Sequence, residues 1–403
     1  MNRLIGQPIA ETILARAIAT ERLGHAYLFL GPAHTGKTTA AALFAQAINC
    51  GEQPAAARAT EGPGERVHGS RWRLTPCGRC ESCRRIAAHT HPEVLWIHPD
   101  SESRQNISIE QAREIRANAA LRPKLGTRRV YLFANAEALS EPAANALLKT
   151  LEEPSLSVML ILCAPHPGLV LPTIRSRCQP IRFGLTPRAE IEGALTDAGA
   201  DPEQVRALAA GCAGRPGIAL SWLQRPETFR SRATVLEIFL EALEVQGEAA
   251  EHPWMAIRAL KLAERLRGLA APSRGKPAGA ARRKGKKSAP VVDPATDEEP
   301  TRPPRVVLRE HLGVGWGLLR DVLLMAHGAG SDLAENQDYL PAIAAVVGRV
   351  EPIRLADSVG AVREAQELLD RNVTPALVLE RMFWTLICGV SAGRALVHEG
   401  GQR

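Results

Sequence analysis

The sequence predicts an α/β domain with a parallel sheet in its first half, followed by helical regions. Over residues 1–184, apolar runs of strand length alternate with helical patterns, which is typical of a parallel sheet. The runs lie at 26–30, 93–97, 129–134 and 158–163. From about residue 231 onward the pattern is helical and contains no convincing strand. The third observation is a glycine-rich loop directly after the first run, which indicates a binding site at the end of that strand.

This loop, residues 31–38, reads GPAHTGKT and fits the phosphate-binding pattern G-x-x-x-x-G-K-[ST]. Residues 38–49 continue with alanine, leucine and phenylalanine at helical spacing. Strand, loop and helix in this order turn backbone N–H groups toward phosphate oxygens at a helix N-terminus, which a chance lysine in a glycine turn would not do. We expect Lys37 to reach the β- and γ-phosphates and Thr38 to hold Mg²⁺. The candidate residues for ATP and Mg²⁺ are Gly31, Gly36, Lys37, Thr38 and Thr39.

Beyond the α/β domain we expect a small helical unit over 185–228 and a larger helical domain over 229–403. The first opens at Thr186-Pro187, a common start of a helix. The second is interrupted over 271–304 by a stretch rich in Pro, Gly, Ala, Lys and Arg that ends acidic. Such a composition buries too little apolar surface to offset the entropy of ordering, so we predict a disordered insertion.

The formal charge of +7 is concentrated in one short segment. Residues 274–287 hold seven basic side chains and no acidic one, so the rest of the chain is close to neutral. The charge therefore does not predict a basic globular surface. No apolar run reaches the length of a membrane span, and the first residues lack a signal-peptide core. We expect a cytoplasmic protein without a membrane partner.

Four of the eight cysteines have the spacing of a metal site: Cys50, Cys77, Cys80 and Cys83. The last three form a C-x₂-C-x₂-C run with turn residues, and Cys50 follows the predicted helix of the loop. Four soft thiolates predict a closed, structural Zn²⁺ site without a catalytic role. An iron–sulfur cluster is the other thiolate option, whereas a disulfide suits a cytoplasmic protein less well. We expect the nearby His89 and His91 to be surface residues and not ligands.

Several segments in series resemble the bacterial DNA polymerase III clamp-loader subunits, delta-prime and its relative gamma/tau, which have the AAA+ ATPase fold. They are residues 25–29 (HAYLF), the loop, the four cysteines, residues 144–154 (ANALLKTLEEP) and residues 171–178 (LPTIRSRC). The resemblance covers residues 1–225 strongly. The helical C-terminal part, with NVTP at 372–375, is similar to the delta-prime collar domain more weakly.

The resemblance implies an AAA+ α/β domain with a zinc-binding insertion over 50–83, a small helical lid and an all-α collar domain. It implies partners as well. Family members form a hetero-pentameric ring of gamma/tau, delta and delta-prime subunits that places the sliding clamp on primed DNA. In the family, the Ser-Arg-Cys motif carries an arginine finger that enters the ATP site of the neighbouring subunit, and the matching residue is Arg177. Without the whole motif, Arg177 would be read as a surface charge at a strand end.

The hydrolytic positions depart from the family pattern. A working P-loop ATPase needs acidic residues after a central strand, where the family has an Asp-Glu pair. Here that pair aligns with Ala134 and Asn135, and Glu137 follows two positions later and is expected to face elsewhere. The strand at 158–163 ends without a sensor hydroxyl, and Arg215 is out of register for the second sensor arginine near Gly217.

These departures favour a delta-prime-type subunit that has a nucleotide-binding fold and little or no ATPase activity of its own. Two alternatives remain at this point. One is a gamma/tau-type ATPase motor, against which the missing acidic pair argues. The other is a stand-alone zinc-bearing DNA-binding protein, against which the near-neutral charge outside 274–287 argues.

Overall fold

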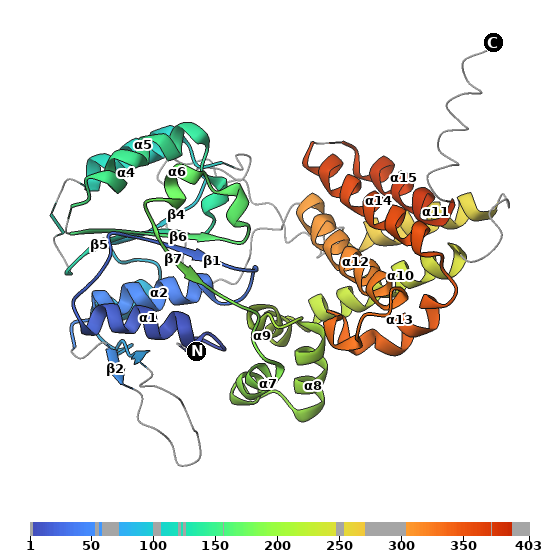
Figure 1. Ribbon diagram of the computed structural model, residues 1–403, viewed down its shortest axis with the longest axis horizontal. Helices are drawn as coiled ribbons and strands as arrows, with labels where there is room; N and C mark the ends of the chain where they lie inside the picture. The colour runs from blue at the N-terminus through green and yellow to red at the C-terminus, as the bar shows by residue number, and fades with distance from the viewer. Residues whose placement is uncertain are drawn as a thin grey trace, which may run out of the picture. The chain divides into compact units, whose positions relative to one another are not determined.

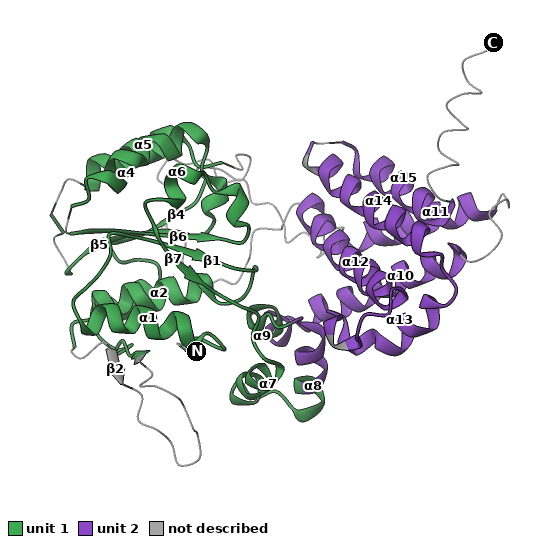
Figure 2. Cartoon of the chain, viewed as in Figure 1, with its two compact units in different colours: residues 1–205, 214–220 green, residues 206–213, 221–403 purple. Residues whose placement is uncertain are grey.

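The computed structural model describes residues 3–52, 56–58, 72–99, 106–119, 122–123, 126–155, 157–246, 254–270, 304–371 and 373–388. The expected insertion over 271–304 lies outside the described residues, except that Pro304 already begins a helix. The described chain divides into two compact units, residues 1–205 with 214–220 and residues 206–213 with 221–403 (Figure 2). No helix in the described ranges is long and apolar enough to cross a membrane.

The first unit is built around a five-stranded parallel sheet in the order β4-β5-β6-β1-β7. Its strands are β1 (Ala26–Leu30), β4 (Val94–Ile97), β5 (Arg129–Phe133), β6 (Val158–Ala164) and β7 (Gln179–Arg182). The four strands expected from the apolar runs are therefore confirmed to within one residue at each end. Strand β6 is buried along its whole length, as both-sided burial of a parallel sheet requires.

Helices cover both faces of this sheet, and Figure 1 shows them as two layers. Tyr27 and Phe29 of β1 pack with α1 and α2, while Leu28 points to the opposite core with α4 and α5. The helices of these layers are α1 (Pro8–Ala19), α2 (Lys37–Ile48), α4 (Ile109–Ala119), α5 (Glu141–Glu152) and α6 (Pro172–Arg175). Short 3₁₀ helices η1 (Ala136–Ala138) and η2 (Pro167–Leu169) follow β5 and β6.

An insertion between α2 and β4 carries the cysteines. It contains a small antiparallel hairpin, β2 (Ala56–Arg58) with β3 (Trp72–Leu74), and then α3 (Glu81–Ala87). After β7 the chain forms three short helices, α7 (Arg188–Asp197), α8 (Pro202–Gly211) and α9 (Pro216–Gln224), which span the division between the two units.

The second unit is helical throughout its described residues. Its elements are α10 (Pro226–Gln246), α11 (Trp254–Leu269), α12 (Pro304–Ala326), η3 (Ser331–Leu333), η4 (Gln337–Tyr339), α13 (Leu340–Val347), α14 (Pro352–Asp370) and α15 (Pro375–Cys388). Their apolar faces form one core in which the rings of Phe239 and Phe383 lie 5.6 Å apart. An ion pair between the buried Arg232 and the partly buried Asp338, at 2.6 Å, ties α10 to η4.

Candidate functional site

The glycine-rich loop joins β1 to α2, as the sequence predicts. Gly31 has a φ of 143°, and a Cβ atom there would lie 2.0 Å from the backbone oxygen of Phe183. Only glycine therefore lets the loop pass so close to the end of β7. Gly36 has a φ of 93° and precedes the first turn of α2, where Thr38 and Thr39 are exposed.

Lys37 lies inside this loop. It is 5% exposed, and its Nζ donates hydrogen bonds to the carbonyl oxygens of Gly31 at 2.7 Å and Pro32 at 2.6 Å. Burial lowers the pKa of Lys37, and the negative charge of Glu137 acts in the opposite direction. Because the lysine lies against its own loop, phosphate oxygens would have to replace these carbonyl partners.

The loop also contacts the start of α9 and the N-terminal segment. The backbone N–H of Gly217, at the start of α9, donates to the carbonyl oxygen of His34 at 3.0 Å. Arg215 lies just before α9, and its Nε is buried. Leu4 packs 3.1 Å from the position that a Cβ of Gly36 would take.

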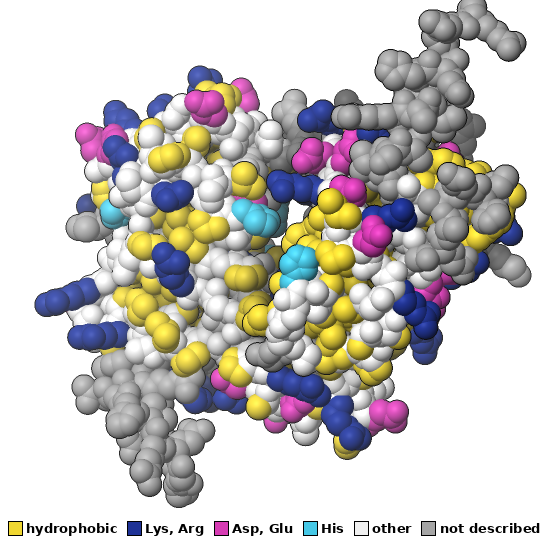
Figure 3. Space-filling model, turned by 45° about the vertical axis from the view of Figure 1, so that its right-hand side comes forward, with side chains coloured by type: hydrophobic (Ala, Val, Ile, Leu, Met, Phe, Trp, Pro, Cys, Tyr) yellow, Lys and Arg dark blue, Asp and Glu magenta, His cyan; other side chains and the backbone are white. Residues whose placement is uncertain are grey.

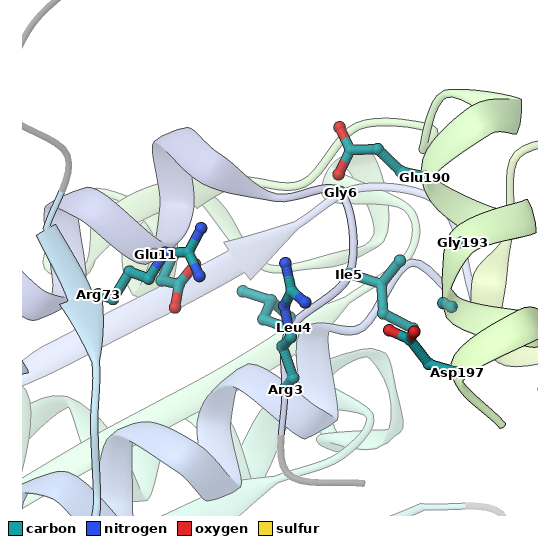
Figure 4. A pocket seen from close by; sticks show the side chains of 10 residues that line it. Arg3, Leu4, Ile5, Gly6, Glu11, Arg73, Glu190, Gly193 and Asp197 are labelled. Carbon is teal, nitrogen blue, oxygen red and sulfur yellow. The ribbon is translucent and has the colours of Figure 1, made fainter. Parts of the chain in front are cut away.

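Leu4 also lines a pocket of about 220 Å³ formed by the N-terminal segment, β3 and α7. In Figure 4, Arg3 lies in the middle, Glu190 and Asp197 of α7 on one side, and Glu11 with Arg73 on the other. The pocket therefore adjoins the phosphate loop through Leu4. The pocket could not be predicted from the sequence, because its walls come from segments that are far apart in the chain.

The positions that should carry acidic residues hold other contacts. Ala134 and Asn135 follow β5, and the side-chain oxygen of Asn135 accepts the backbone N–H of Glu137 at 3.1 Å, capping η1. The carboxylate of Glu137 accepts the backbone N–H of His166 and lies 3.3 Å from its Nδ1. At the end of β6, Cys163 is buried beside the loop, and burial raises its pKa to about 12. A neutral thiol and an amide cannot act as a general base.

The four cysteines Cys50, Cys77, Cys80 and Cys83 come together, with their sulfur atoms all within 4.8 Å of one another. Backbone N–H groups point at these sulfurs: that of Cys80 at Sγ of Cys77 (3.2 Å) and that of Cys83 at Sγ of Cys80 (3.4 Å). Gln46 of α2 donates to the carbonyl oxygen of Cys83 at 2.9 Å and so ties α3 to α2. The cluster is able to hold a metal ion, and its four thiolate donors fit a tetrahedral ion.

The two histidines near the cluster differ from each other. His89 is exposed and stacks on Trp96 at 4.2 Å. His91 is only 4% exposed, and its Nδ1 accepts the backbone N–H of Glu93 at 3.1 Å. The expectation of a surface position is wrong for His91, because this hydrogen bond folds the ring in at the start of β4.

Arg177 and the phosphate loop lie at opposite ends of the parallel strands. Strands β1 and β7 are parallel, with Leu30 beside Arg182. The loop follows the carboxyl end of β1, whereas Arg177 precedes the amino end of β7. Its side chain is 35% exposed, and Nη2 lies 2.6 Å from a carboxylate oxygen of Glu152. The parallel strands thus separate Arg177 from the glycine-rich loop of its own chain.

Comparison with known proteins places this geometry in a family. A family model described as DNA polymerase III, delta subunit, matches residues 6–186. The DNA polymerase III subunit delta' of Bacillus subtilis is 32% identical over 259 residues, which cover 63% of this chain and 71% of that protein. The chain belongs to the delta-prime family of DNA polymerase III subunits.

Two further relatives match shorter regions. The delta' subunit of Pseudomonas aeruginosa is 40% identical over 154 residues, covering 38% of this chain and 41% of that protein. The tau/gamma subunit of Haemophilus influenzae is 38% identical over 175 residues, covering 43% of this chain and 22% of that protein. The matched stretch thus spans less than half of each of these two relatives. The parallel sheet between helical layers fits the AAA+ fold expected for the delta-prime family.

Proposed function

We propose that this delta-prime family member works inside a cytoplasmic clamp-loader ring with gamma/tau and delta subunits, and helps place the sliding clamp on primed DNA. Its own part is to donate Arg177 to the ATP bound by a neighbouring subunit. In this proposal α7–α9 are the lid, and the helical unit that begins at α10 is the collar.

The observation that carries the proposal is the placement of Arg177. It lies across the sheet from its own phosphate loop and is partly exposed, so the phosphate that it serves must belong to another chain. A guanidinium presents a planar set of donors that matches the charge developing on a transferring phosphoryl group. A partner subunit supplies the ATP, and Arg177 supplies the charge.

We further propose that the phosphate loop holds ATP and Mg²⁺ without hydrolysing it. Gly31, Gly36 and Lys37 would form the phosphate cradle, Thr38 and Thr39 lie in the first turn of α2, and the pocket beside Leu4 would take the rest of the nucleotide. What is missing is a base, because Ala134 and Asn135 replace the acidic pair. The cysteine cluster would hold one structural Zn²⁺ that supplies no chemistry to ATP.

The test is ATP turnover by the ring assembled with this chain. Arg177→Ala should leave ring assembly intact, slow ATP hydrolysis and impair clamp loading. Arginine fingers are worth roughly 10³–10⁵ in well-studied GTPases, and we expect a smaller loss because other sites keep their own fingers. Arg175→Ala is the matched control, since Arg175 is exposed and its Nη1 contacts the carbonyl oxygen of Pro167 instead. Wild-type turnover by Arg177→Ala rings would overturn the proposal.

A second measurement separates this proposal from a motor subunit. The isolated chain should bind ATP, and Lys37→Ala should weaken that binding while changing clamp loading little. A robust ATPase rate of the isolated chain that Lys37→Ala abolishes would instead indicate a gamma/tau-type motor.

A further inference from the structure

The guanidinium of Arg177 is held by three contacts within the chain. Nη2 pairs with Oε1 of Glu152 at 2.6 Å, and Nη1 donates to the carbonyl oxygen of Thr173 at 3.1 Å and to Oγ of Ser176 at 3.3 Å. Thr173 and Ser176 belong to the same short segment as Arg177, so they travel with it. Glu152 alone comes from a different element, the last residue of α5.

The place of Glu152 is not explained by the stability of its own helix. A helix C-terminus carries partial negative charge, which disfavours a carboxylate in the last turn. Lys149 is the basic residue that α5 offers there, yet the ion pair of Glu152 is with Arg177. Glu152 therefore gains its compensation from the arginine, and in return it fixes the direction of the guanidinium.

This arrangement leaves the arginine able to act on an outside anion. A guanidinium has five N–H donors, and the three contacts use two on Nη1 and one on Nη2. The Nε–H and the second Nη2–H make no hydrogen bond with the described residues, so they remain for oxygens of a ligand. Long arginine side chains lose much rotamer freedom when they are fixed, and a side chain that is fixed before the ligand arrives loses less on binding.

We propose that Glu152 is a positioning residue for Arg177, holding the guanidinium in the direction from which it reaches the ATP of the neighbouring subunit. The inference rests on the proposed function of Arg177 as a finger acting in trans. It assigns a role to the first of the two glutamates in residues 151–154 (LEEP), a role that the sequence alone does not give.

The pair is suited to this role without being needed for folding. The side chains of Arg177 and Glu152 are 35% and 49% exposed. An ion pair with this much exposure to solvent adds little to the stability of the fold. Glu152→Gln, which keeps size and shape and removes the charge, should therefore leave the thermal unfolding of the chain unchanged. Any effect on the ring then reports on the direction of Arg177.

The experiment compares rings built with wild-type chain, Glu152→Gln, Arg177→Ala and the double variant, with Glu153→Gln as the matched control. Glu153 is the exposed neighbour that caps α5. We measure kcat and KM for ATP with clamp and primed DNA present, and ring assembly by gel filtration. Glu152→Gln should lower kcat about two- to fivefold, the range that an exposed ion pair supplies, with KM nearly unchanged.

The double variant should be no slower than Arg177→Ala, because Glu152 acts only through Arg177. Glu153→Gln should match the wild type. If Arg177→Ala is slow while Glu152→Gln turns over at the wild-type rate or faster, the positioning role is wrong and the finger stands. Losses that multiply in the double variant would also overturn the positioning role. If Arg177→Ala itself is unimpaired, the proposed function fails first, and this inference fails with it.

Discussion

At the scale of single residues, the cysteine cluster gives the most direct test. Four thiolates around one ion predict about one zinc per chain, held in a closed site. Cys80→Ser removes one of the four ligands and should lower the zinc content and loosen α3, because Cys80 is the N-cap of this helix. Metal analysis of the purified protein measures the first effect.

The control is Cys388→Ser, since Cys388 is a half-buried free thiol outside the cluster. It should leave the zinc content unchanged. Full zinc in Cys80→Ser would contradict the assignment, and iron with sulfide in the wild-type protein would favour an iron–sulfur cluster instead.

A second residue, His311, predicts how stability depends on pH. Its Nε2 lies 3.1 Å from Oγ of Ser231, Nδ1 has no partner among the described residues, and burial lowers its pKa from 6.5 to about 4. The folded form therefore keeps the imidazole neutral, while the unfolded chain takes up a proton below pH 6.5. Stability should be full above that pH and fall as the pH drops toward 4, by roughly 2 kcal/mol at pH 5.

His311→Gln keeps a hydrogen-bonding side chain but removes the titrating group. Amide hydrogen exchange of α10 and α12 at pH 7.5 and pH 5 should show a larger loss of protection in the wild type than in this variant. Equal losses in the two proteins would show that other groups set the acid sensitivity.

The grouping of residues could be predicted from the sequence where local spacing defines it. The glycines and Lys37 of the loop, and the four cysteines, are close in the chain or follow a recognisable helix, so their grouping could be read directly. Glu152 and Gln46 could not be found in this way. Their partners, Arg177 and Cys83, lie 25 and 37 residues away, and only the packing of helices against the sheet brings them together.

At the scale of elements, α12 approaches α10 through a glycine. A Cβ at Gly315 would lie 2.2 Å from the ring of Phe239, which is fully buried and packs against Phe383. A Cβ at Gly313, two residues earlier and exposed, would meet its first neighbour at 3.9 Å, the side chain of Gln366. The two glycines lie in the same helix but differ in the room available for a Cβ atom.

Gly315→Ala should therefore destabilise the helical unit by about 1–2 kcal/mol, because overpacking outweighs the better helix propensity of alanine. Gly313→Ala should stabilise it by roughly 0.5–1 kcal/mol, because only the propensity changes. Urea unfolding followed by circular dichroism measures both. Equal shifts of the same sign would mean that the ring of Phe239 moves aside freely.

Elements were predictable where the apolar pattern is long and were missed where it is short. Strands β1, β4, β5 and β6 are apolar runs, whereas β7 reads Gln-Pro-Ile-Arg with one buried residue, Ile181. It is a strand because it adds to the edge of the sheet beside β1, where Pro180 is tolerated. The hairpin of β2 and β3 has three residues in each strand, too few for a period to show.

At the scale of the whole molecule, the excess positive charge lies in a different part of the chain from the described helices and strands. On the face shown in Figure 3, arginine and lysine side chains are scattered among acidic and apolar ones. The excess positive charge of the sequence lies in residues 274–287, outside the described residues. The core of the helical unit is formed by residues of α10–α15. Residues 271–303, between α11 and α12, lie outside the described residues.

Replacing residues 271–303 by a short glycine–serine linker should therefore leave the fold intact. Loop length changes the free energy of unfolding only slowly, so a shift below about 1 kcal/mol is expected in thermal unfolding. Retention on duplex DNA at low salt should fall, since eight basic and four acidic side chains are removed, a net loss of positive charge whose contribution is screened by added salt.

A charge-only control separates the two effects. Changing the seven basic residues of 274–287 to glutamine in the full-length chain should reduce DNA retention at least as much as the replacement does, because the acidic residues of 293–299 stay in place, with no change in unfolding. If the replacement makes the chain insoluble or keeps it out of the ring while the charge variant behaves normally, the segment itself packs into the helical unit. Equal DNA retention in all three proteins would place the DNA-attracting charge elsewhere on the surface.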